Sequence, residues 1–85
     1  MDFKNIVLEQ AQAIGVSLTD EQAEKCLAYM LDEMNIPLMV KEEIALYLKT
    51  RSYDFVSSES IAFLKMFSNG MNAYIFAVSE ENDNN

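Results

Sequence analysis

Apolar residues recur at intervals of three and four positions along most of this 85-residue chain. The pattern is most regular between positions 23 and 34, where it comprises Ala23, Cys26, Leu27, Met30, Leu31 and Met34. This spacing places the side chains on one face of an α-helix, because a helix has about 3.6 residues per turn. The chain has only 2 Gly and 1 Pro, too few for the many tight turns of a multistranded sheet. The sequence therefore predicts an all-α protein.

The helix that contains this stripe also has the clearest start signal in the chain. Thr19 is a good N-cap residue, and Gln22 three positions later completes a capping box. Leu18, which precedes the cap, can pack against Ala23 as a hydrophobic staple. These residues predict that the helix begins immediately after Thr19 and continues to about Asn35.

Two further helices are predicted on either side of it. The first runs from Asp2, which can serve as N-cap, to Ile14, and Gly15 can adopt the left-handed conformation that ends a helix. The third helix runs from about Pro37 to Arg51. Its apolar residues form two strips, one of Val40, Ile44, Tyr47 and Leu48 and a second of Leu38, Ala45 and Leu46.

The last helix is expected to begin after a cap at Ser57 or Ser58 and to continue to about Val78, straight or kinked near Asn69-Gly70. The alternative is a helix that ends at Ser68, followed by a strand over residues 73–78. No other segment has the two-residue alternation of a strand, so that strand would need a partner from another subunit.

The segments that flank this last helix are predicted to be irregular. Residues 52–56 form a linker, and its two aromatic side chains, Tyr53 and Phe55, are expected to enter the core. Residues 79–85 are polar and acidic and have nothing to bury. We therefore predict one helical domain over residues 1–78, a small three- or four-helix bundle, with a disordered acidic C-terminal tail over residues 79–85.

The composition removes most kinds of catalytic and metal site. The chain has no His and one Cys, which excludes Ser-His and Cys-His pairs, an internal disulfide and zinc sites built from several such ligands. Gly15 and Gly70 are the only glycines, so no glycine-rich phosphate loop can form. Adjacent carboxylates such as Glu42 and Glu43 point about 100° apart on a helix and do not converge. We predict a protein that is not an enzyme and has no cofactor and no metal.

Charge and hydropathy narrow the possible partners and the location. A net charge of −8 disfavours direct binding to nucleic acid, and no basic face is available to hold an anionic membrane. No apolar run approaches the roughly 20 residues needed to span a bilayer, and the first residues lack a signal-peptide pattern. Because a lone Cys suits a reducing compartment, we expect a cytoplasmic protein.

Two short segments are similar to parts of known families. Residues Gly15 to Gln22 resemble a helix start near the N-terminus of the small-subunit ribosomal RNA methyltransferase G family, over this one capped start only. The cofactor loop of that family is absent, so the resemblance implies no activity. The helix, short break and helix before Ser57-Ser58-Glu59-Ser60 are similar in layout to small phage head–tail connector proteins.

The excess of apolar surface gives the functional prediction. A chain this short buries only about 60–65% of the surface that it exposes when unfolded, and the last two predicted helices each carry more than one apolar strip. We predict a protein–protein interaction module that forms a homodimer, docks on a larger protein, or does both, through an apolar patch of the third and fourth predicted helices. The predicted partner-binding residues are Phe63, Phe67, Met71 and Tyr74.

The acidic residues suggest a different function. Glu21, Glu24 and Asp32 form a partial row of carboxylates on the second predicted helix. Such a row could imitate the phosphates of nucleic acid. The alternative prediction is therefore an acidic inhibitor of the phage type, which would block a nucleic-acid-binding enzyme.

Overall fold

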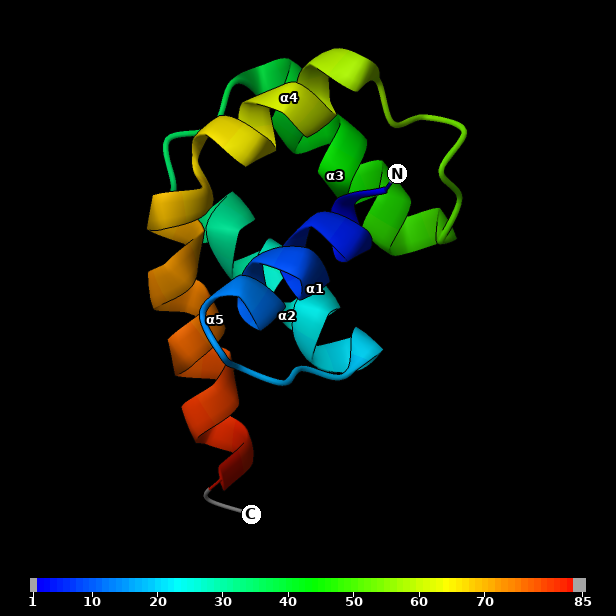
Figure 1. Cartoon of the computed structure of the whole chain (residues 1–85). Coiled ribbons are helices and arrows are strands. Elements are labelled where there is room, and N and C mark those ends of the chain that lie inside the picture. Colours follow the sequence, from blue (N-terminus) through cyan, green and yellow to red (C-terminus); the bar gives the residue numbers. More distant parts are fainter. Residues whose placement is uncertain (1, 84–85) are drawn as a thin grey trace.

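Five α-helices make up the computed structural model of the protein, which describes residues 2–83 (Figure 1). They are α1 (Phe3–Ala13), α2 (Asp20–Glu33), α3 (Leu38–Thr50), α4 (Ser58–Met66) and α5 (Ser68–Asp83). No strand occurs between residues 2 and 83, so the predicted all-α class is confirmed.

The apolar stripe of α2 forms the centre of the core. Ala23, Cys26, Leu27 and Met30 are completely buried, while Leu31 and Met34 are partly buried at the edge of the core. Three helices, α1, α3 and α5, pack against α2. Figure 1 shows α5 running along one flank of α1 and α2, with α4 across the top and α3 on the other side.

Local capping chemistry sets the ends of the first two helices as predicted. The Gln22 amide donates to Thr19 Oγ1 at 3.2 Å, and the Thr19 amide donates to Gln22 Oε1 at 2.8 Å, which completes the capping box. The Asn5 amide donates to the Asp2 carboxylate at 2.8 Å at the start of α1. Gly15 has a φ of 79°, the left-handed conformation expected after α1.

The predicted last helix is divided into α4 and α5 at Phe67. The Phe67 amide donates to the carbonyls of Leu64 and Lys65, which tightens the final turn of α4 before the chain changes direction. The break allows α4 to contact α1 and α3 while α5 lies along α1 and α2. The strand alternative over residues 73–78 is wrong, because this segment lies within α5.

Gly70 lies in the first turn of α5, beyond the break rather than at it. A Cβ atom at this position would lie 3.1 Å from the Cε atom of Met34 at the end of α2. Glycine therefore lets the start of α5 approach the end of α2 closely.

The helix α5 continues to Asp83, into the segment that was expected to form a disordered tail from Ser79. Glu81 provides the physical reason, because it finds partners on α2. The Tyr29 hydroxyl donates to Glu81 Oε1 at 2.9 Å, and Lys25 Nζ lies 2.6 Å from Glu81 Oε2. The Lys25 ammonium, with the Tyr29 hydroxyl, lowers the pKa of the Glu81 carboxyl. Residues 84–85 of the predicted tail lie outside the described residues.

The two linker aromatics lie at the surface, so the prediction that they enter the core is wrong. Tyr53 and Phe55 are 44% and 49% exposed. Tyr47 already fills the adjacent core position and contacts the Phe3 ring edge-on. Tyr53 stacks on the Tyr47 ring from outside, with 5.1 Å between ring centroids, and thus covers the core without entering it.

We predict that Thr19→Ala lowers the free energy of unfolding by about 1 kcal/mol, because it removes the oxygen that caps the first turn of α2. Urea denaturation followed by circular dichroism measures the change. Thr50→Ala is the matched control, since the Thr50 hydroxyl donates to the Leu46 carbonyl and accepts from the Ser52 amide at an exposed site, and caps no helix start. Equal effects of the two substitutions would contradict the importance of the cap.

We predict that Leu27→Ala lowers the free energy of unfolding by about 2–5 kcal/mol, because Leu27 is fully buried at the centre of the α2 stripe. The same deletion at Leu38, which is 69% exposed, should change it by less than about 0.5 kcal/mol. Chemical denaturation of both variants tests the pair. A near-neutral Leu27→Ala would mean that α2 faces the core with a different side.

Candidate functional site

The exposed large apolar side chains are concentrated in the second half of the chain. Eight such side chains are exposed among residues 2–83, from 36% at Leu46 to 78% at Met66. We call them the exposed apolar surface: Leu38, Met39, Leu46, Tyr53, Phe55, Met66, Phe67 and Phe76. None of these lies on α1 or α2, where the exposed positions are polar, charged or alanine. Patches of exposed apolar side chains are typical of binding surfaces, so the elements that carry these eight residues are the candidates for such a surface.

One side of α3 carries a regular part of this surface. Val40, Ile44 and Tyr47 are buried and attach the helix to the core. The opposite side, which we call the outer face of α3, consists of exposed residues that recur every three or four positions: Leu38, Met39, Glu42, Ala45, Leu46 and Lys49. Four of these six side chains are apolar, one is acidic (Glu42) and one is basic (Lys49). Glu42 and Lys49 lie seven residues apart.

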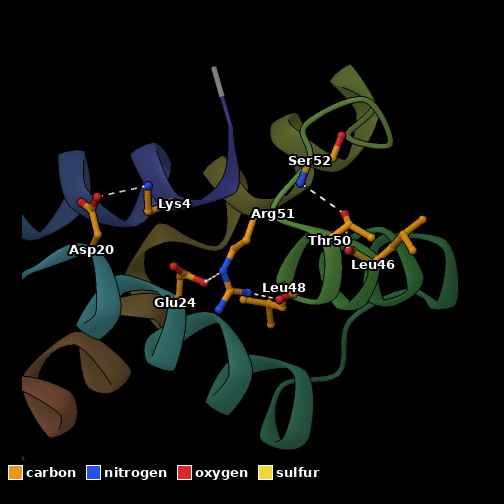
Figure 2. Close-up of polar contacts among 8 residues, drawn as sticks. All are labelled: Lys4, Asp20, Glu24, Leu46, Leu48, Thr50, Arg51 and Ser52. Atoms are coloured by element: carbon orange, nitrogen blue, oxygen red, sulfur yellow. Dashed lines mark hydrogen bonds and ion pairs between the residues drawn. The ribbon is translucent and has the colours of Figure 1, made fainter.

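An ion pair with α2 fixes the C-terminal end of α3. Arg51 ends the helix in the left-handed conformation, with a φ of 57°, and its amide donates to the Tyr47 carbonyl at 2.7 Å. Its Nε atom lies 2.9 Å from Glu24 Oε2, and its Nη1 atom donates to the Leu48 carbonyl (Figure 2). A left-handed conformation is uncommon for a residue other than glycine, and these contacts hold Arg51 in it.

A second polar cluster fixes α4 against the middle of α3. Glu43 accepts hydrogen bonds from the Ser57 amide at 2.9 Å and from the Ser57 hydroxyl at 3.0 Å. It also accepts one from the hydroxyl of Ser60, a residue that is completely buried. Negative charge is favourable at the N-terminus of a helix, so Glu43 acts as a cap supplied by another helix. The Glu43 side chain is thereby directed toward α4 and away from the outer face of α3.

The four predicted partner-binding residues do not form one surface. Phe63 and Phe67 stack with 4.5 Å between ring centroids, and Phe67 is 38% exposed. Tyr74 is partly buried, and burial raises the pKa of its hydroxyl. Met71 is completely buried, so its inclusion was wrong: the turn at Phe67 directs Met71 into the core with Ile75.

Sequence reasoning placed the partner-binding residues on the last predicted helix and left out Leu38, Met39 and Leu46. A signal for this surface was present, because Leu38, Ala45 and Leu46 form the second apolar strip of the third predicted helix. One face of a helix suffices to attach it to a core, so a second strip is left for solvent or a partner.

Acidic and basic residues are also distributed unevenly along the chain, with most of the excess of acids in residues 1–34, whose described part has no exposed large apolar side chain. Residues 1–34 contain seven acids and two bases, while residues 35–79 contain four of each. The remaining three acids lie in residues 80–85. The exposed apolar surface therefore belongs to the part of the chain that is neutral overall.

The possible metal-ligating side chains and the single thiol lie apart from one another in the described residues. No cluster of three or more possible metal-ligating side chains occurs among residues 2–83. Cys26 is buried, which raises the pKa of its thiol to about 12. A hollow of about 290 Å³ between α1 and α2 has one carboxylate in its lining, Asp20, and Lys4 Nζ lies 3.2 Å from it (Figure 2). Over the same residues, none of the helices has the length and apolar content required to cross a bilayer.

Comparison of the chain with protein-family models, curated proteins and solved structures finds no match. The chemistry of the outer face of α3 and of the exposed Met66 and Phe67 at the α4–α5 turn is therefore the basis for assigning a function.

We predict that Glu43→Ala lowers the free energy of unfolding by about 1–3 kcal/mol, because it leaves the buried Ser60 hydroxyl without its carboxylate acceptor. The neighbouring exposed acid provides the control: Glu42→Ala should change stability by less than about 0.5 kcal/mol. Thermal and urea unfolding of both variants give the comparison. Identical losses would show that Glu43 does not act as a cap for α4.

Proposed function

We propose that this protein is a protein–protein interaction module that docks through its exposed apolar surface. One observation carries the proposal: all eight large apolar side chains that remain exposed among residues 2–83 lie between Leu38 and Phe76. A random scatter would place some of them on α1 and α2. Their restriction to α3, α4, α5 and the linker favours a surface kept for a partner.

The energetics of burial support this function. Each Å² of apolar surface removed from water contributes about 25 cal/mol, and only contact with another molecule can remove the surface that folding leaves exposed. A standard interface buries about 800 Å² per partner, which is about one sixth of the 5081 Å² accessible surface of this chain. Because residues 35–79 contain equal numbers of acids and bases, this part of the chain has no net charge to repel a charged partner.

The alternative function, an acidic imitation of nucleic acid, rests on the row Glu21, Glu24 and Asp32. Glu24 contributes little to such a row, because its side chain is only 18% exposed and pairs with Arg51. Asp20, beside the row, also has a basic partner in Lys4. These contacts weaken the case for phosphate mimicry and favour the apolar surface.

Site-specific photo-crosslinking tests the proposal. A benzophenone amino acid replaces Leu38, Leu46 or Met66 on the exposed apolar surface, and in control proteins it replaces Gln12 on α1 or Asp32 on α2. When the proteins are irradiated in an extract of the source cells, the first three positions should give protein adducts of defined mass. The yield of these adducts should be the same at low and high salt, because apolar docking is insensitive to screening.

The controls distinguish the two functions. Adducts that form only from Gln12 or Asp32, in a yield that falls when irradiation is carried out at higher salt, would support the acidic imitation of nucleic acid instead. Adducts of undefined mass from all five positions would contradict a specific docking surface.

A further inference from the structure

We infer that the outer face of α3 pairs with the same face of a second copy of this chain. The two helices lie antiparallel about a two-fold axis between Ala45 and Leu46, and Glu42 of each copy faces Lys49 of the other. This inference rests on the proposed docking function and names the partner. It is carried by the placement of two opposite charges on an otherwise apolar and exposed helix face.

The geometry of α3 determines the register. Glu42 and Lys49 lie seven residues apart, which is two turns and about 10 Å along the axis. In an antiparallel pair centred between Ala45 and Leu46, Glu42 meets Lys49 at both ends and Ala45 meets Leu46 in the middle. Two opposite-charge contacts then flank an apolar centre, and the two-fold axis makes them equivalent.

Other arrangements bring like charges together. A parallel pair about a two-fold axis would place Glu42 against Glu42 and Lys49 against Lys49. An antiparallel pair shifted by half of the seven-residue repeat, so that its centre lies at Glu42 or Lys49, would bring two copies of that residue together. Like charges in contact are costly at an interface, so the alternation of charge selects one register.

Charge also selects α3 as the face through which a second copy can approach. A protein of net charge −8 repels its own copies through most of its surface, and residues 1–34 carry most of that excess. The helix α3 contains two acids, Glu42 and Glu43, and two bases, Lys41 and Lys49. Glu43 is occupied by Ser57 and Ser60. Lys41, although exposed, lies about 100° around the helix from Glu42 and outside the outer face. Glu42 and Lys49 therefore form a self-complementary pair there. A strongly basic partner would choose α1 and α2 instead.

The size of the face predicts a reversible dimer. A helix of 13 residues is about 20 Å long, and one face of it buries less than the roughly 800 Å² per partner of a standard interface. Dimerisation is therefore expected at high protein concentration and should be weak enough to measure directly.

Charge reversal with rescue tests the pairing. Sedimentation equilibrium of the full chain gives the dimer dissociation constant for the native sequence, Glu42→Lys, Lys49→Glu and the variant with both changes. Each single reversal creates two like-charge contacts in the dimer and should raise the constant at least about tenfold. The variant with both changes restores two opposite-charge contacts and should return it to within about threefold of the native value.

Two matched controls separate this contact from the effect of net charge. Glu9→Lys on α1 and Lys65→Glu on α4 change the net charge by the same amounts at exposed positions outside the outer face of α3. They should leave the constant within about threefold of the native value. Circular dichroism melting curves establish that every variant is folded, and the positions are exposed, so the native helices should be kept.

Each other outcome overturns the inference. A native chain that remains a 9.7 kDa monomer up to about 1 mM excludes the dimer. Single reversals no more disruptive than their controls exclude the Glu42–Lys49 contact, and a folded double variant that fails to dimerise excludes the register. In all of these cases, crosslinking of Leu38 or Leu46 to a different protein would still support the docking function, so the two proposals fail separately.

Discussion

The complete burial of one face of α2 is the constraint on which the rest of the structure depends. Because Cys26, Leu27 and Met30 have no exposed area, they must be enclosed on all sides, and α1, α3 and α5 supply the enclosure. Each of these helices commits one face to the core. For α3 that face is Val40, Ile44 and Tyr47, so a helix with apolar residues on two sides must leave the second side outward. The candidate docking surface is thus a consequence of how the core is filled.

Polar contacts specify how the helices are positioned on one another, which apolar packing alone does not. The hydrophobic effect is roughly proportional to buried area and does not specify the register of one helix on another. The Glu24–Arg51 pair fixes the end of α3 on α2, and Glu43 fixes the start of α4 on α3. In the Glu24–Arg51 pair, the Arg51 side chain is 61% exposed and that of Glu24 only 18%. Solvent screening on one side and desolvation on the other offset much of the attraction, so the pair acts mainly by selecting one geometry. With Glu43 turned inward, Glu42 is the acid that remains on the outer face of α3.

Local chemistry made the ends of the first two helices predictable, whereas the later departures depend on contacts between distant residues. Thr19 with Gln22, Asp2 and Gly15 act within a few residues of themselves, and each occupies its predicted place. The turn at Phe67 has no comparable local signal, because α4 and α5 separate in order to cover different helices. Met71 shows the effect of this missing signal. It lies on a helix, as its spacing predicts, but the direction of α5 after the turn places its side chain in the core and not on the surface. The last turn of α5 contacts Lys25 and Tyr29 through Glu81, and those residues lie more than 50 positions earlier in the chain. The strip of Leu38, Ala45 and Leu46 was visible in the sequence, although its exposure follows only from the placement of α3.

The single thiol of the protein has a consequence for experiments. Cys26 lies at the centre of the packed helices, and its proton is held so firmly that almost no thiolate is present near neutral pH. Reaction with a disulfide reagent therefore requires the helices around α2 to separate first. The rate at which the natural sequence is labelled at this position reports how often the helices around α2 open. No cysteine has to be introduced by mutation. Cys26 is therefore a natural reporter of opening, located at one of the most completely buried positions of the fold.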